Sequence, residues 1–346
     1  MKRLSALGAL ALLSGCTTIG YYAQAVGGHL EVMRLAAPIE ERLREPGTPE
    51  PLRAKLARAL AIREFASREL ALPDNGSYRR YADLGRPFVV WNVVAAPEFS
   101  VEPLESCFPF AGCVSYRGYY SEEAARRYAA ALAEKGYDVH LGGAPAYSTL
   151  GWFDDPVLST FIHYPEAELA GVVFHELAHQ AVYLKGDTMF NESFASTVEE
   201  EGVRRWLERE GTPAQRAAYA ESRRRRSEFA ALVIKYRAEL AAFYDRPGQL
   251  EEKRAGKRRL FSEMEDEYLA LRISWGGFAG YDRLFARGAN NALLASVASY
   301  AELVPAFRAL LAKKQGDLAA FYDAVRDLES LEKPERDARL AALAAQ

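Results

Sequence analysis

Three residues near the middle of the chain have types and spacing that could bind a metal ion and activate water. His175, Glu176 and His179 form the pattern H-E-x-x-H within the stretch ELAGVVFHELAHQAVYL, which is otherwise apolar and helix-forming. On a helix, residues four positions apart lie on one face, so both imidazoles can reach one ion while Glu176 stands beside it. The pattern predicts a metal site on a helix, although so short a motif also recurs by chance.

A second helix is predicted directly after this one, with the sequence TMFNESFASTVEEEGVRRWL. Gly186 and Asp187 end the first helix and cap the second. An antiparallel pair with a tight turn returns Glu192 and Glu199 towards the histidines. A catalytic zinc ion typically has three protein ligands and one open position, and two histidines with one of these glutamates complete that set. The His/His/Glu set favours Zn²⁺, one per chain, over manganese or cobalt.

HELAHQ followed by NESFAS resembles the H-E-x-x-H and N-E-x-x-A motifs of the gluzincin metallopeptidases, the group of thermolysin and aminopeptidase N. Stretches such as ANNALLASVASY also resemble a bacterial family of predicted zinc aminopeptidases, lipoprotein-like proteins, over most of residues 20–325. The resemblance implies a peptidase with Glu192 as the third ligand. Spacing alone leaves Glu199 as a rival. With Glu192 at the metal, we expect Glu199 to hold an imidazole N–H, and Asn191 to support the same site.

The predicted reaction is hydrolysis of a peptide bond. A zinc ion lowers the pKa of water and polarises a carbonyl, and Glu176 can accept a proton from that water and pass it to the leaving amine. The resemblance places a donor for the developing oxyanion in the distal helical part, where Tyr300 is the candidate. The other interpretation of Tyr300 is a core aromatic residue of an amphipathic helix.

An aminopeptidase must also recognise a free amino terminus, normally with acidic side chains. The G-x-M-E-N segment of aminopeptidase N is not found in this sequence, which leaves Asp154 and Asp155 in STLGWFDDP as candidates. A turn that caps the next element explains these two residues equally well. One alternative function is a cell-envelope endopeptidase or amidase with the same zinc chemistry. Another is a non-catalytic envelope-binding lipoprotein.

The first residues, MKRLSALGALALLSGC, have the basic start and short apolar run of an export signal. The stretch resembles a bacterial lipoprotein signal, which implies cleavage after residue 15 and lipidation of Cys16. Without an acidic residue directly after Cys16, the resemblance favours an outer-membrane protein facing the periplasm. In that oxidising compartment Cys107 and Cys113 are predicted to form a disulfide, with two free thiols as the alternative.

The remaining patterns predict an α+β fold, mostly α, with a zincin-like metallopeptidase core. The stretches RPFVVWNVVAAP and GYDVHL are strand-like, and a capped helix is predicted between them. We expect a signal peptide at 1–15 and one metallopeptidase unit at 16–346. Within that unit, residues 20–160 form a helical hairpin and a small sheet, and residues 161–330 form a helical body with the zinc site. The last residues are predicted to form a loosely packed helix.

Composition restricts the partners. With 44 basic and 47 acidic residues in 346, the near-neutral charge does not favour nucleic-acid binding. The run RRRR at 223–226 has glutamates around it and is predicted to be a solvated helix face. The expected partners are a peptide substrate and, through lipid on Cys16, a membrane. The chain is expected to be a monomer.

Overall fold

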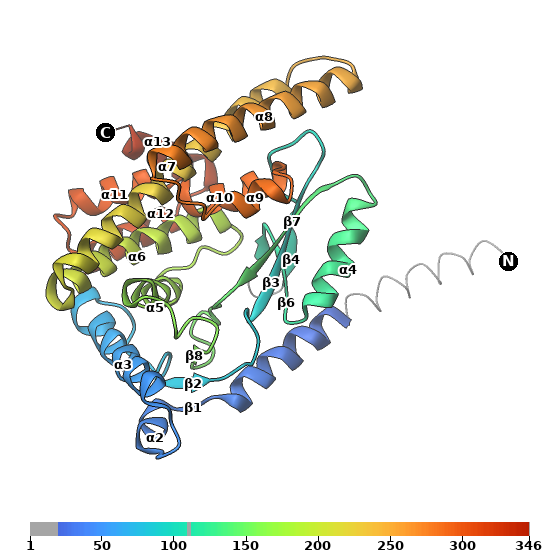
Figure 1. The fold of residues 1–346 in the computed structure, drawn as a ribbon. Helices are drawn as coiled ribbons and strands as arrows, with labels where there is room; N and C mark the ends of the chain where they lie inside the picture. Colours follow the sequence, from blue (N-terminus) through green and yellow to red (C-terminus); the bar gives the residue numbers. More distant parts are fainter. Residues whose placement is uncertain (1–19, 109–111, 346) are drawn as a thin grey trace.

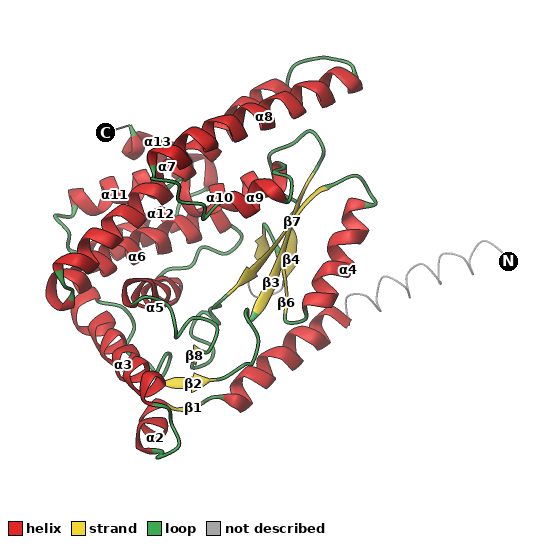
Figure 2. Cartoon of the chain, in the orientation of Figure 1, coloured by secondary structure: helices red, strands yellow, loops and turns green. Residues whose placement is uncertain are grey.

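The computed structural model describes residues 20–108 and 112–345 and is mostly helical with small sheets, which confirms the predicted α+β, mostly α class. The predicted signal segment and Cys16 lie outside the described residues. Figure 1 shows the small sheets beside a body of long helices, and Figure 2 separates helices from strands by colour. The strands are β1 (Ala37–Pro38), β2 (Arg80–Ala82), β3 (Val90–Ala96), β4 (Ser106–Phe108), β5 (Gly112–Val114), β6 (Arg117–Tyr119), β7 (Asp138–Ala144) and β8 (Val157–Leu158).

The main sheet has the order β6-β3-β7, with both neighbours antiparallel to β3. Helix α4 (Glu122–Ala133) packs on one face of it, and the inward side chains of Val93, Ala95 and Leu132 form a small core there. Ser121 caps α4 by accepting the N–H of Ala124. The two strands and the capped helix between them are therefore found where the sequence predicts them. Two smaller sheets have the orders β1-β2-β8 and β4-β5.

Long helices make up the rest of the molecule. The described chain starts in a helix at residues 20–35, which the short strand β1 separates from α2. From Glu166 onward the described chain is almost entirely helical, in agreement with the predicted helical body. The helices are α2 (Ile39–Arg44), α3 (Glu50–Leu70), α5 (Glu166–Ala181), α6 (Thr188–Glu210), α7 (Pro213–Tyr244), α8 (Leu250–Ser274), α9 (Asp282–Ala286), α10 (Asn291–Ala301), α11 (Val304–Lys313), α12 (Leu318–Glu329) and α13 (Lys333–Ala344).

The largest hydrophobic core joins both ends of the described chain, since its members range from Val32 to Leu340. The prediction of a loosely packed last helix is wrong. Leu340 of α13 is only 1% exposed, and Arg336 donates a 2.9 Å hydrogen bond to Asp187, the residue that caps α6. Helix α13 is therefore fixed to the N-terminus of α6.

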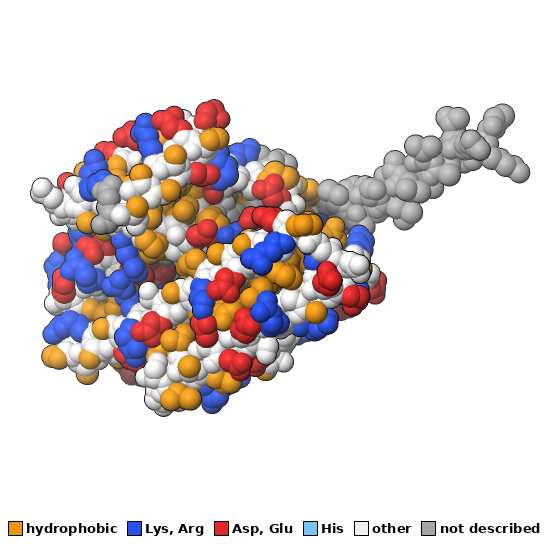
Figure 3. All heavy atoms as spheres, turned by 90° about the horizontal axis from the view of Figure 1, so that it is seen from above, with side chains coloured by type: hydrophobic (Ala, Val, Ile, Leu, Met, Phe, Trp, Pro, Cys, Tyr) orange, Lys and Arg blue, Asp and Glu red, His pale blue; other side chains and the backbone are white. Residues whose placement is uncertain are grey.

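One helical stretch of the described chain, Asn291–Lys313, is long and apolar enough to span a membrane. Half of its most apolar part is buried inside the protein, where Leu293, Leu294 and Phe307 belong to the interior. Interior packing therefore accounts for its apolar character. Lysines, arginines and acidic residues are mixed over the face shown in Figure 3, in keeping with the near-neutral composition.

Candidate metal centre and catalytic cleft

Helices α5 and α6 carry the predicted metal ligands and pack closely against each other. The apolar side chains of α5, including Val173, Phe174 and Leu177, are fully buried, which fixes the helix in the core. Two glycines permit the close approach. A Cβ added at Gly202 of α6 would lie 2.7 Å from the Phe174 ring, and one at Gly171 of α5 would lie 3.2 Å from the Glu199 carboxylate.

The turn between the two helices is fixed by side chains of α6. Asp187 caps the helix by accepting the N–H of Phe190. The amide of Asn191 accepts the N–H of Leu184 and donates to the Leu184 carbonyl, both at 2.7 Å. Asn191 thus acts on the turn backbone, and through it sets the position of the neighbouring Glu192.

The side chains of His175, His179 and Glu192 converge. One ligand atom from each lies within 4.8 Å of the other two. Glu192 Oε2 is 3.2 Å from His175 Nε2 and 3.6 Å from His179 Nε2. The carboxylate is only 8% exposed, and although burial acts to raise its pKa, the two imidazoles hold it well below the usual range. A buried anionic oxygen and two imidazole nitrogens fit a divalent transition metal such as zinc.

Glu199 lies on the other side of the His175 ring. Its Oε2 is 3.3 Å from His175 Nδ1, and its Oε1 accepts a 2.9 Å hydrogen bond from Arg226 of α7. If Nδ1 carries the proton that Glu199 accepts, the lone pair of Nε2 is free for a metal. Burial acts to lower the pKa of His175, but hydrogen bonds to Glu192 and Glu199 outweigh it and raise that pKa to about 10, so metal binding at Nε2 would release a proton.

Arg226 differs from its neighbours in the RRRR run at 223–226, which the sequence predicts to be a solvated helix face. Arg224 and Arg225 pair with Glu221 of their own helix, as a solvated face should. Arg226 instead crosses to α6 and pairs with Glu199, where its side chain is 48% exposed. One of the four arginines therefore belongs to the metal-site surroundings.

A cleft passes over the metal site and has a cavity on each side of it. The hairpin cavity, about 310 Å³, is lined by Phe108 and Val114 of the β4–β5 hairpin and by several tyrosines. The sheet cavity, about 470 Å³, is lined by β7 residues 142–144 and by Glu199 and Arg226. His175, Glu176 and Tyr300 line both cavities, so the two meet at the predicted catalytic residues.

Glu176 lies in this cleft beside the two histidines. Burial raises the pKa of its carboxyl group, while the neighbouring charges of His175 and His179 act to lower it. A carboxylate with a raised pKa is a stronger base than an exposed one, as a proton acceptor for water requires. The position agrees with the role predicted from the motif.

Tyr300 also lies at the centre of the cleft. Its ring stacks on His175 with centroids 6.0 Å apart, and it is 45% exposed. The charge of Glu192 and burial raise its pKa well above 10, so the hydroxyl stays protonated and able to donate. The core-aromatic interpretation does not fit this position.

Two further tyrosines near the site were not singled out from the sequence. Tyr116 and Tyr183 both line the hairpin cavity. Burial raises the pKa of each hydroxyl, and the charge of Glu192 raises it further. Tyr183 follows His179 by four residues, a spacing that could have identified it. Tyr116 comes from the segment after β5, and no local pattern points to it.

Asp154 and Asp155 do not line either cavity among the described residues. Asp155 is 1% exposed, and its Oδ2 accepts the N–H of Thr149 at 2.9 Å. Asp154 is exposed and lies against Gly76. These positions favour the turn-capping interpretation over substrate binding.

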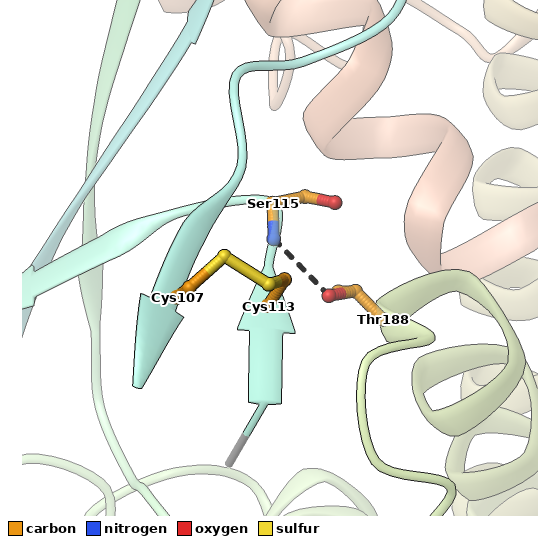
Figure 4. Close-up of a disulfide and its surroundings, with 4 residues drawn as sticks. All are labelled: Cys107, Cys113, Ser115 and Thr188. Carbon is orange, nitrogen blue, oxygen red and sulfur yellow. Dashed lines mark hydrogen bonds between the residues drawn. A yellow bond between two sulfur atoms is a disulfide. The ribbon is translucent and has the colours of Figure 1, made fainter. Parts of the chain in front are cut away.

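Cys107 and Cys113 are joined in a disulfide across the β4–β5 hairpin. Figure 4 shows this bond beside the start of α6, where Ser115 N–H donates to Thr188 Oγ1 at 3.2 Å. A Cβ at Gly112 would lie 2.8 Å from the Gly186 nitrogen, so the hairpin touches the turn between the metal-site helices. The disulfide therefore stiffens one wall of the hairpin cavity. Because it uses both cysteines, the nearby group of Glu105 with these cysteines is not a metal site.

Two histidines one helical turn apart, with a buried carboxylate converging on them, form a group on a helix pair that could hold a metal ion. The chain belongs to the family described as "Putative aminopeptidase", whose model matches residues 20–340. Membership indicates a peptidase that acts on peptide substrates. Searches of curated proteins and of solved structures found no match to the chain.

Proposed function

We propose that the protein is a zinc-dependent aminopeptidase with a zincin-like core. The observation that carries the proposal is the convergence of His175, His179 and Glu192 at the floor of a cleft that also contains Glu176. These three residues would hold the metal. When bound, a zinc ion acts as a Lewis acid that polarises a carbonyl and makes water a better nucleophile near neutral pH.

The side chains around that site each have a role in the proposed hydrolysis. Glu176 accepts a proton from the attacking water and returns it to the amine of the leaving peptide. Tyr300 donates its hydroxyl proton in a hydrogen bond to the oxyanion that develops on the scissile carbonyl. Glu199 keeps the His175 ring oriented, and Asn191 keeps Glu192 in place through the turn.

The sheet beside the cleft can align a peptide. Strand β7 is at an edge of the described β6-β3-β7 sheet, and its residues 142–144 line the sheet cavity. An extended peptide can pair with such an edge through backbone hydrogen bonds. This supports a peptide rather than a small-molecule amide as the substrate.

We also propose that the chain is a single metallopeptidase unit and a lipid-anchored monomer in the periplasm, attached to the outer membrane through Cys16. The shared core from Val32 to Leu340 supports the single unit. The pattern LSGC supports the anchor and the disulfide suits an oxidising compartment. Metabolic labelling with a palmitate analogue tests the anchor, since Cys16→Ala should lose the label.

The test of the activity compares matched peptides with free and acetylated amino termini. With zinc, the full-length protein should release the first residue of the free peptide and leave the acetylated peptide intact. Glu176→Gln should lower kcat by about 10²- to 10⁴-fold, as expected for loss of a general base. Activity that persists after complete removal of metal would contradict the proposal.

The second candidate is an endopeptidase of the cell envelope. The cleft extends on both sides of the site, which gives room for residues before and after the scissile bond. Internal cleavage of the acetylated peptide would favour this candidate over the aminopeptidase.

A further inference from the structure

The two cavities that meet at the candidate metal site differ in their linings. Among the described residues that line the hairpin cavity, Glu176 and Glu192 are the carboxylates, and none is a lysine or an arginine. The sheet cavity contains Glu168, Glu176 and Glu199 together with the guanidinium of Arg226, which pairs with Glu199. The two described linings therefore carry a similar net charge, and the hairpin cavity is distinguished by the aromatic side chains of its walls.

Away from its two carboxylates, the hairpin cavity is neutral and largely aromatic. Its described walls include Tyr21, Val90, Phe108, Val114, Tyr120 and Tyr147. Burial raises the pKa of Tyr120 to about 12, so its hydroxyl is uncharged at neutral pH. The Tyr147 hydroxyl is already engaged, 2.9 Å from His29 Nδ1. These walls offer an apolar surface and no charged partner for a substrate side chain.

We propose that the hairpin cavity binds the amino-terminal residue of the substrate and selects a large, uncharged, aromatic or aliphatic side chain. The inference rests on the proposed aminopeptidase function and adds its specificity. The side chain of the first residue points to the tyrosine walls, and the rest of the peptide continues along β7, whose residues 142–144 line the sheet cavity.

The alternatives are disfavoured by the same walls. A lysine or arginine side chain loses hydration there without gaining a carboxylate, and burying an unpaired charge is costly. A glutamate or aspartate side chain likewise loses hydration against these walls, because the described lining has no lysine or arginine to pair with it. Alanine or glycine fits but leaves apolar surface uncovered, so it gains less from burial than a large side chain does.

The test measures kcat/KM of the full-length, zinc-loaded protein on X-Ala-Ala peptides with X as Phe, Leu, Ala, Lys or Glu. Phe and Leu should exceed Ala by at least about tenfold, and Lys and Glu should be slower than Ala. Ala-Phe-Ala should be no better than Ala-Ala-Ala, because the selective position is the first. A preference for Lys, Glu or Ala at the first position would overturn the inference while leaving the peptidase activity intact.

A matched pair of variants locates the selectivity. Ala25, on the helix of residues 20–35, lines the hairpin cavity, whereas its neighbour Val26 does not and is 58% exposed. Ala25→Glu should raise the Lys-to-Phe ratio of kcat/KM by tenfold or more, because it adds a carboxylate to the wall. Val26→Glu makes the same change in net charge and should leave the ratio unchanged. Equal ratios in the two variants would contradict the assignment of the cavity.

A binding measurement separates this inference from the proposed function. Calorimetry with Glu176→Gln should give a tighter Kd for Phe-Ala-Ala than for Ala-Ala-Ala by at least about tenfold. If the wild type hydrolyses no peptide but this difference is found, the pocket assignment stands and the activity fails. Equal affinities would overturn the pocket assignment, whatever the wild type hydrolyses.

Discussion

Glu199 offers a quantitative test of how the metal site is built. Its carboxylate lies between His175 Nδ1, at 3.3 Å, and Arg226, at 2.9 Å, and it is not among the three converging ligands. Partners of this kind typically contribute about 10- to 100-fold in metal affinity, or roughly 1.4–2.7 kcal/mol. Glu199→Gln keeps an oxygen acceptor for the imidazole and should lose about tenfold. Glu199→Ala removes it and should approach the 100-fold end.

Zinc dissociation constants of the purified variants, measured by competition with a chromophoric chelator, provide the assay. Arg226→Gln should have a smaller effect than either Glu199 variant, because the Arg226 side chain is half exposed and solvent screens its pairing. Glu200→Gln is the matched control, since Glu200 is the next residue on α6 and pairs with Arg308 away from the ligands. Complete loss of zinc in Glu199→Gln, with tight binding retained in Glu192→Gln, would mean that the ligand assignment is reversed.

Three further predictions concern packing, the disulfide and pH. Gly171→Ala should weaken zinc binding, because its Cβ would lie 3.2 Å from the Glu199 carboxylate; unchanged affinity in the chelator assay would contradict this close packing. Replacing Cys107 and Cys113 together by Ser should lower the free energy of unfolding by about 2 kcal/mol in urea titrations, and should raise KM because the hairpin lines the cavity. Burial raises the pKa of Asp155 from 3.8 to about 7, so the folded chain holds a proton there that the unfolded chain has released, and stability is lost as the pH rises between these values. Asp155→Asn should therefore gain stability over wild type by up to about 4 kcal/mol at pH 8 and by much less at pH 5; an equal difference at both pH values would refute the shifted pKa.

The sequence predicted the parts of the site that are local. The spacing of His175 and His179, the cap at Asp187 and the position of Glu192 soon after it are all encoded within one helical hairpin. Periodicity and capping residues also predicted most helices and the two longer strands, because these signals act over a few residues.

The rest depends on contacts between segments that are distant in the sequence. Tyr116 reaches the site because the β4–β5 hairpin packs against the α5–α6 turn, and no pattern around residue 116 encodes that packing. The sequence does not distinguish Arg226 from the neighbouring arginines, because its partner, Glu199, lies on another helix. For Asp155 the sequence left substrate binding and turn capping equally open, because only the fold shows that the loop turns inward and that the carboxylate accepts the N–H of Thr149.

The proposed metal centre is tested most directly by the metal content of the purified full-length protein, measured by elemental mass spectrometry beside that of Glu192→Ala. Each variant is saturated with zinc and then desalted, and folding is checked by circular dichroism. We expect one zinc per wild-type chain and none in the folded Glu192→Ala variant. A folded wild-type protein that retains no metal would contradict the proposed metal centre, and a Glu192→Ala variant that retains it fully would contradict the role of Glu192 as a ligand.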